Sequence, residues 1–287
     1  MKLIILFSPL VLLLSTCIKN NPDPSWIKVT DWALLSNINY SGEEGQLTKN
    51  LSEAWLYVDD ELVGVFQLPF KIPILKSGGV TIKLFPAIKN NGIAATKKVY
   101  PFMETYETSG VLIKNDTLTI NPTTKYKDNL IFTIEDFEDI NTNLVNDPNT
   151  STASYSLQNT NLQWFNGNFY AHVELNAVDS SWVAYTNWIS YIPKGKEVYL
   201  EIDYRNTNNV VTGLIAISPS GTLPNPHITL QTQDASTVVW KKIYLDLREM
   251  VGASANGAYF EHSFEAYLDE GLSNTEIEID NIKLIHF

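Results

Sequence analysis

The fold is decided by segments such as Val198-Tyr-Leu-Glu-Ile-Asp-Tyr204, in which apolar and polar side chains alternate. Successive side chains of a β-strand point to opposite faces, so Val198, Leu200 and Ile202 share one face and the residues between them the other. Similar short runs, bounded by turn residues, recur along the chain, and no segment has a convincing helical period. The pattern predicts an all-β protein built from sandwiches of short strands.

Strand patterns occur in both halves of the sequence. In the distal half they cover residues 132–139, 182–188, 213–217, 240–247 and 277–284, and one short helix is predicted around 247–251. In the proximal half they cover residues 54–58, 62–66, 70–75, 80–85, 94–102 and 111–120. Pro69 and Pro73 make the segment at 70–75 suitable for a sheet edge, because proline cannot donate a ladder hydrogen bond. An Asn- and Pro-containing stretch at 121–125 predicts a boundary between two domains.

A signal peptide is predicted at the start of the chain, where Met1-Lys2 precedes an apolar run at 3–14. The run is shorter than the roughly 20 residues that span a bilayer as a helix. The segment Leu14-Ser-Thr-Cys17 resembles the lipobox of bacterial lipoproteins, although Thr16 departs from the usual Gly, Ala or Ser. The resemblance implies cleavage before Cys17 and acylation of that cysteine, and several acyl chains anchor a protein stably. The alternative is an ordinary signal peptide with an incidental cysteine.

The predicted organisation is therefore a signal peptide at 1–16, a lipidated tether at 17–25, a small β-sandwich at 26–125 and a jelly-roll sandwich at 126–287. Cys17 is the only cysteine, so no internal disulfide can form. From residue 17 to 125 there are 11 Lys and 11 acidic residues, whereas from 126 to 287 there are 8 basic and 21 acidic residues. The acidic distal half argues against nucleic acid as a partner.

Six lysines lie between Glu61 and Glu104, an interval that contains no acidic residue. They are Lys71, Lys76, Lys83, Lys89, Lys97 and Lys98. One interpretation is a surface that faces an acidic partner or anionic head groups, and the other is a set of solvent-facing lysines on strands.

A hairpin with the turn Asp59-Asp60-Glu61 is predicted between the strands at 54–58 and 62–66. The run from Val58 to Pro69 resembles the pattern of PEGA-like surface modules. The resemblance implies a small sandwich of immunoglobulin or transthyretin type.

Three motifs of the distal half resemble carbohydrate-binding-type jelly rolls with galactose-binding-like topology. They are Asp136-Phe-Glu138, the strand at 240–247 and Asp280-Asn-Ile282. The resemblance implies that the first and last strands lie together and that a structural calcium ion sits between them. Carboxylates supply the oxygen ligands that calcium requires. The matching positions are Glu138 and Asp280, then Glu135 and Asp136, and the alternative is that these acids are solvated strand ends.

Aromatic side chains near the predicted loops are candidates for stacking on sugar rings. They are Trp164, Trp182, Tyr185 and Trp188, of which Trp164 is the best candidate for an exposed ring. The alternative is core packing, because Trp182, Ala184 and Trp188 share one face of a regular strand.

No catalytic constellation is recognisable. His172, His227, His262 and His286 are scattered, and no HExxH, GxSxG or P-loop pattern occurs. The sequence therefore predicts a non-catalytic protein, and a hydrolase using two converging acids is kept as an alternative. Thr117, in Asp116-Thr-Leu118, resembles the short O-glycosylation acceptor of Bacteroidota-type exported proteins.

Together these features resemble a Bacteroidota-type outer-membrane lipoprotein, on either the periplasmic or the cell-surface side. The first hypothesis is an accessory or scaffold subunit that binds another envelope protein. The second is a glycan-binding surface lipoprotein that uses aromatic side chains of the jelly roll. The first predicts an exposed apolar patch, and the second predicts exposed rings.

Overall fold

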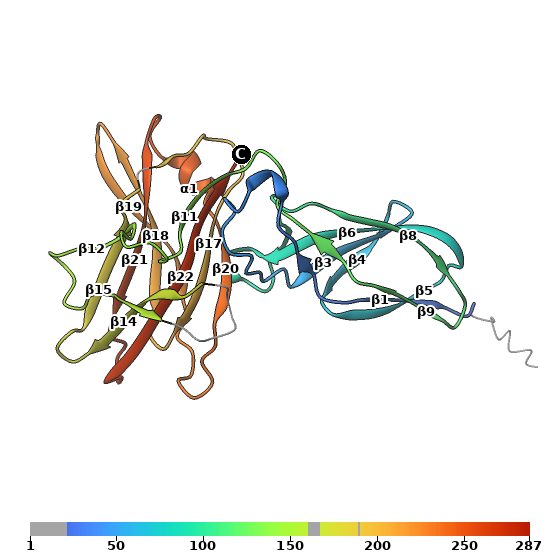
Figure 1. The fold of residues 1–287 in the computed structure, drawn as a ribbon, viewed down its shortest axis with the longest axis horizontal. Coiled ribbons are helices and arrows are strands. Elements are labelled where there is room, and N and C mark those ends of the chain that lie inside the picture. Colours follow the sequence, from blue (N-terminus) through green and yellow to red (C-terminus); the bar gives the residue numbers. More distant parts are fainter. Residues whose placement is uncertain (1–21, 160–166, 189) are drawn as a thin grey trace, which may run out of the picture.

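The structure is a computed structural model and describes residues 22–159, 167–188 and 190–287. Two β-domains lie end to end in an elongated molecule, the first on the right of Figure 1 and the second on the left. The all-β prediction of a small sandwich followed by a jelly-roll sandwich is confirmed. No helix among the described residues is long and apolar enough to cross a membrane.

The first domain packs a three-stranded sheet, in the order β5-β1-β9, against a five-stranded sheet in the order β4-β3-β6-β7, with β8 also paired to β6. A short pair, β2 and β10, lies outside these sheets. The strands are β1 (Ser25–Val29), β2 (Ala33–Leu34), β3 (Glu53–Val58), β4 (Glu61–Gln67), β5 (Phe70–Ile74), β6 (Gly78–Lys89), β7 (Lys97–Val99), β8 (Tyr106–Leu112), β9 (Thr117–Ile120) and β10 (Thr123–Thr124). Short 3-10 turns occupy Ile38–Tyr40 and Asn90–Gly92.

The predicted hairpin forms between β3 and β4, and the proline-flanked β5 is an edge strand, as expected. Asp59 and Asp60 both have positive φ angles, which is the backbone of a tight hairpin turn that matches strand twist. Two expected strands are shorter than predicted. Only Lys97–Val99 is extended within 94–102, and a turn before Thr117 divides the segment at 111–120 into two strands.

The described residues of the second domain form two antiparallel sheets of six strands each. Sheet I has the order β13-β14-β22-β17-β20, with β11 also paired to β22, and sheet II has the order β12-β15-β21-β18-β19, with β16 also paired to β21. The strands are β11 (Ile131–Glu135), β12 (Leu144–Asn146), β13 (Ser156–Asn159), β14 (Phe169–Asn176), β15 (Ser181–Thr186), β16 (Ser190–Tyr191), β17 (Val198–Asn206), β18 (Val210–Ser218), β19 (Gly221–Leu230), β20 (Lys241–Asp246), β21 (Tyr259–Tyr267) and β22 (Asn274–His286). The predicted helix is present as α1 (Arg248–Ala253), and the first and last strands of the domain are neighbours.

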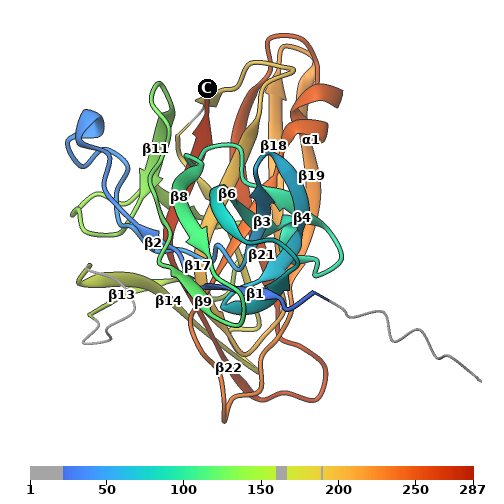
Figure 2. The same cartoon turned by 90° about the vertical axis from the view of Figure 1, so that its right-hand side faces the viewer.

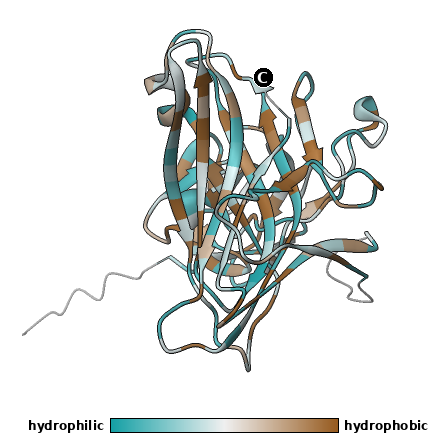
Figure 3. Ribbon diagram, turned by 90° about the vertical axis from the view of Figure 1, so that its left-hand side faces the viewer, coloured by the Kyte–Doolittle hydropathy of each residue, from teal (hydrophilic) through white to brown (hydrophobic). Residues whose placement is uncertain are grey.

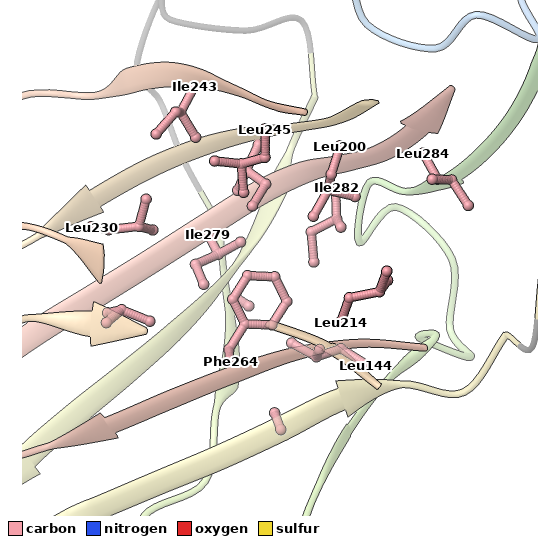
Figure 4. Close-up of a cluster of buried hydrophobic side chains, with 14 of the residues drawn as sticks. Leu144, Leu200, Leu214, Leu230, Ile243, Leu245, Phe264, Ile279, Ile282 and Leu284 are labelled. Carbon is pink, nitrogen blue, oxygen red and sulfur yellow. The ribbon is translucent and has the colours of Figure 1, made fainter. Parts of the chain in front are cut away.

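The core of the second domain lies between the two sheets. Figure 4 shows Leu200, Ile279 and Ile282 of sheet I opposite Leu214 and Phe264 of sheet II. All five side chains are buried, and none carries a polar atom that would need a partner. The apolar residues of the opening segment therefore point into this core, as their alternation predicts.

Candidate functional site

The two sheets of the second domain differ in what covers their outer faces. The first domain packs against the outer face of sheet I, whereas sheet II lies on the far side of the molecule (Figure 1). Tyr100 and Phe102 of the first domain meet Tyr199 of β17 edge to face, with ring centroids 5.3 and 5.8 Å apart. Tyr244 and Ile285 belong to the same buried cluster as the core of the first domain. The domains are therefore joined by a continuous apolar core.

Charged side chains of sheet I are buried beneath the first domain. Glu201 accepts hydrogen bonds from the hydroxyls of Tyr100, at 2.6 Å, and Tyr126, at 3.0 Å. The ammonium group of Lys242 lies 3.0 Å from Glu201 and 3.7 Å from Asp203. Burial raises the pKa of Glu201, but the charges of Lys242 and Lys283 outweigh this effect and hold it below its usual range. Such a cluster joins surfaces because each buried charge has its partner on another strand or in the other domain.

A second set of ionic contacts borders the same interface. Lys98 donates to the hydroxyl of Tyr199, at 2.7 Å, and lies 3.1 Å from Asp246. Arg248 lies 2.8 Å from the same carboxylate. Burial raises the pKa of Asp246, but hydrogen bonds from Arg248 and Lys98 outweigh it and hold the pKa far below its usual range. The outer face of sheet I is thus used for joining the domains along β17, β20 and the distal part of β22.

The outer face of sheet II remains open. In β21, burial alternates strictly from Tyr259 to Ala266, so every second side chain points away from the core. Figure 3 looks onto this side of the molecule and shows apolar and polar segments alternating along the strands. Tyr185 stands on this face opposite Ser263, and Val145 is its neighbour on the other side.

Four tyrosines gather on or beside this open face, and the rings of three are about half exposed. Tyr191, Tyr259 and Tyr267 are 58%, 48% and 55% exposed, and Tyr185 is half-buried. The rings of Tyr191 and Tyr259 lie 6.0 Å apart at a steep angle. A pocket of about 380 Å³ opens beside Tyr191, between residues 191–194 and 254–258.

Acidic groups are the only full charges on the strands of sheet II. Glu261 and Glu265 point outward from β21, and none of the described strands of this sheet contains Lys or Arg. Burial raises the pKa of Glu261, and a hydrogen bond to Glu265 raises the pKa of Tyr267. The face therefore combines ring surfaces with hydrogen-bond acceptors, which suits a neutral ligand that carries both C–H faces and hydroxyl groups.

The predicted aromatic candidates have different fates. Trp182 is fully buried, stacks on Phe264 and donates to Asn146 at 2.9 Å, so it belongs to the core and not to a ligand surface. Trp188 is half-buried and packs against the same core. Core packing, the alternative to ligand binding, therefore describes Trp182 and Trp188 better. Of the four, Tyr185 alone is placed on the open face, and Trp164 lies outside the described residues.

Sequence reasoning missed Tyr191, Tyr259 and Tyr267. The signal was present in Tyr259-Phe-Glu-His-Ser-Phe-Glu-Ala-Tyr267, where aromatic and acidic residues alternate with residues of the core. The alternation shows which residues share a face, but it does not show that this face stays uncovered.

The four predicted calcium ligands do not form a ligand set in this arrangement. The carboxylate of Glu135 accepts hydrogen bonds from the backbone amides of Phe137 and Asn143, and that of Glu138 from the amides of 168 and 169. Among the described residues, no group of three His, Cys, Asp or Glu side chains is arranged to hold a metal ion. Asp280 is buried with one carboxylate oxygen unpaired, and burial, with the charges of Asp203 and Asp136 adding to it, raises its pKa to about 9. Calcium binding stays a prediction.

The lysine-rich stretch does not form a free basic surface. Four of the six lysines are paired with acids from outside the interval, and the Nζ of Lys71 lies 5.1 Å from the centre of the Trp26 ring. The pairs are Lys76–Asp59, Lys83–Asp60, Lys97–Glu53 and Lys98–Asp246. Lys89 is half-buried before the turn that contacts the second domain. In the folded protein, acidic residues from other parts of the chain neutralise most of the positive charge of this lysine-rich stretch.

The remaining predicted positions do not converge on a site. Thr117 is half-buried at the start of β9, and Cys17 lies outside the described residues. Burial lowers the pKa of His262, in sheet II, to about 3. His172 lies in sheet I and contacts Glu174 and Glu278 of the same sheet.

Comparison with known proteins gives low structural similarity and no sequence family. No family model and no curated protein matches the sequence. The chain is similar to a structure of carbohydrate-binding modules of the β-sandwich superfamily (14% identity, 80% of this chain and 83% of that one, TM-score 0.37). It is also similar to a family 29 carbohydrate-binding module variant in complex with mannohexaose (14%, 55% and 91%, 0.34) and to a family 11 module of a cellulosomal cellulase of Clostridium thermocellum (18%, 52% and 91%, 0.33). At this sequence identity and TM-score the similarity does not identify a ligand. The strand topology establishes the fold.

Proposed function

We propose that this protein is a non-catalytic, glycan-binding lipoprotein of the outer membrane, of the Bacteroidota type, with a PEGA-like first domain. The observation that carries the proposal is the open outer face of sheet II, with its tyrosines, two carboxylates and described strands that contain no Lys or Arg. The ligand class is a neutral oligosaccharide, because Glu261 and Glu265 would repel uronic acids or sulfated sugars.

The spacing of the rings favours a chain over a single sugar. Tyr259 and Tyr267 stand four residues on either side of Ser263, the residue opposite Tyr185. At the rise of a β-strand, each interval of four residues is about 13 Å. Rings at such intervals would stack on separate sugar units, while Glu261 and Glu265 accept hydrogen bonds from hydroxyls.

The position of the face agrees with membrane anchorage. The described chain begins at Pro22, at the end of the first domain farthest from sheet II (Figure 1). A lipid on Cys17 would therefore hold the molecule by one end and leave sheet II at the other. Globomycin, which blocks removal of lipoprotein signal peptides, should cause a larger precursor to accumulate, and unchanged processing would contradict the anchor.

Glycan binding is tested by replacing rings on the open face. Tyr185→Ala and Tyr259→Ala should each lower the affinity for neutral polysaccharides about tenfold in affinity electrophoresis or calorimetry. Tyr170→Ala is the matched control, because Tyr170 is a half-buried ring on sheet I, packed edge to face on Trp240. Equal effects of all three replacements, or no binding to any neutral polysaccharide, would refute the proposed face.

The accessory-subunit hypothesis has its own test. A tagged copy is purified from detergent-solubilised envelope, and the proteins that accompany it are identified by mass spectrometry. A stoichiometric partner that is lost in Tyr259→Ala would make the same face a protein-binding surface, and recovery of the protein alone agrees with glycan binding.

A further inference from the structure

Exposed aliphatic side chains gather at the end of the first domain where the described chain begins. Leu75, Val111 and Ile113 are 71%, 61% and 57% exposed. Val111 lies in β8 and Ile113 directly follows it, and these two exposed residues bracket the buried Leu112. None of the three contributes to the apolar cores of the molecule.

Backbone contacts bring these residues to the point where the N-terminal segment leaves. The amide of Asn115 donates to the carbonyl of Pro24 at 2.9 Å, and the hydroxyl of Ser25 donates to the carbonyl of Lys76 at 2.8 Å. Gly78 pairs with Leu112, which places the turn after β5 beside the end of β8. Figure 2 faces this end and shows β1, β8 and β9 there. We call the three aliphatic residues and this end the tip.

The charges near the tip are of both signs, with Lys114 and Asp116 exposed beside Ile113 and two further lysines paired with acids. Lys76 forms an ion pair with Asp59, and Lys83 lies 2.7 Å from Asp60. A surface in contact with the tip therefore needs to be apolar or neutral, and electrostatic attraction to anionic lipid would contribute little.

The chain between Cys17 and the tip is short. Six residues separate Cys17 from Pro24. Even fully extended, the seven steps between these two residues span at most about 25 Å. A lipid on Cys17 would hold the tip within that distance of the bilayer, so a weak apolar contact would form at a high effective concentration.

We propose that the tip docks onto the lipid surface in which the acyl chains of Cys17 are anchored, with Leu75, Val111 and Ile113 entering the interface. This inference rests on the lipid anchor of the proposed function but not on glycan binding. Apolar side chains that dock at an interface lie about 5–10 Å into the boundary between head groups and acyl chains. Docking by the tip directs the open face of sheet II away from the membrane.

The experiment uses the full-length, lipidated protein in phosphatidylcholine vesicles that contain acyl-chain-brominated lipid. Because Cys17 is the only cysteine and its thiol would carry the lipid, a new cysteine can be labelled with an environment-sensitive fluorophore. In Ile113→Cys, we expect a blue-shifted emission and about twofold quenching by the brominated lipid. Ile140→Cys is the control, because Ile140 is 99% exposed in the second domain, and its emission should not change.

A second variant tests the apolar side chains themselves. The label is placed at Lys114→Cys, with and without the replacements Leu75→Ser, Val111→Ser and Ile113→Ser. These side chains are exposed, so the folded protein should tolerate their removal. The triple replacement should abolish the quenching at 114 and leave glycan affinity unchanged.

Several outcomes would overturn the inference. They are a label at 113 that behaves like the one at 140, quenching that needs anionic lipid, and a blue shift that depends on protein concentration without lipid, which would indicate a second copy. Mass spectrometry of the N-terminal peptide separates the causes. An unmodified Cys17 would refute the anchor and the docking together, whereas a lipidated Cys17 with a water-exposed tip would refute docking alone.

Discussion

β21 and β22 lie in opposite sheets of the second domain, and both carry polar residues at alternate positions. Along β21 these residues point into the open, where Glu261 and Glu265 stand among tyrosines. Along β22 every residue from Ile277 to His286 is buried, because the first domain covers the outer face from Asp280 onward and the ion pairs around Glu278 cover the rest. The same alternating pattern therefore gives a solvent-exposed face in β21 and a domain interface in β22. The difference is that the first domain packs on β22.

The covered outer face of sheet I shows how charged side chains can be buried between two domains. Glu201 and Asp203 both lie close to the ammonium group of Lys242, and the tyrosine hydroxyls of the first domain complete the set around Glu201. The open face needs no such partners, because water solvates its carboxylates. Disturbing the first face should therefore affect stability, and disturbing the second should affect binding.

The largest effect is expected for Glu201→Ala on the covered face. It leaves Lys242 without its closest carboxylate and two tyrosine hydroxyls without their acceptor, which should lower the free energy of unfolding by about 4 kcal/mol. The control is Glu265→Ala on the open face, with an expected change within about 0.5 kcal/mol. Urea denaturation measures both, and similar values for the two variants would remove the distinction between the faces.

A smaller effect is expected where the two sides of one strand are compared. Trp182→Ala removes a ring stacked in the core and should lower the free energy of unfolding by about 3 kcal/mol. Tyr185→Ala, three residues further along β15, should change stability by less than about 1 kcal/mol while weakening glycan binding. Thermal unfolding of the two variants is the measurement, and a strongly destabilised Tyr185→Ala would show that this ring is structural.

Removal of one buried carboxyl from the covered face should stabilise the protein at high pH. The folded protein keeps a proton on Asp280 up to about pH 9, whereas the ordinary pKa is 3.8. The folded state therefore binds more protons in this interval, and stability falls as pH rises through it. Asp280→Asn should be several kcal/mol more stable than the natural protein at pH 8 and nearly equal to it at pH 4. Urea denaturation at the two pH values tests this, and an equal difference at both would contradict the raised pKa.

The smallest effect is expected from calcium. Because Glu135 and Glu138 are engaged with backbone amides, millimolar calcium should raise the melting temperature by less than about 1 °C. A larger rise that Asp280→Asn abolishes would mean that these side chains rearrange around the ion, and it would establish the calcium site that the sequence predicts.

Much of the fold could be predicted from local patterns. The hairpin around Asp59-Asp60, the edge position of β5 and the helix after β20 follow from turn residues, prolines and strand periodicity. The extent of the strands at 94–102 and 111–120 could not, because alternation continues through turns that hydrogen bonds alone reveal. The charge balance was read correctly from the sequence, but the lysine stretch is neutralised by residues distant in the chain.

Of the predicted ligand-binding residues that the structure describes, only Tyr185 lies on the face that we propose as the site. Trp182 and Trp188 share the face that the sequence assigned to the core, and periodicity alone supported that interpretation. Tyr191, Tyr259 and Tyr267 come from two strands that the sequence did not single out, and strand register places them on or next to the same face as Tyr185. Because the surface is assembled from residues on several strands, no continuous sequence motif predicts it.

The sequence by itself determined the alternation in Val198-Tyr-Leu-Glu-Ile-Asp-Tyr204, and with it which side chains enter the core between the sheets. The tertiary structure decided what happens to the other side of that strand. Glu201 and Asp203 have the composition of a solvated face, yet both are fully buried. They are buried because the first domain supplies two tyrosine hydroxyls and a threonine hydroxyl, and β20 supplies Lys242, so that the loss of water is offset by hydrogen bonds and ion pairs.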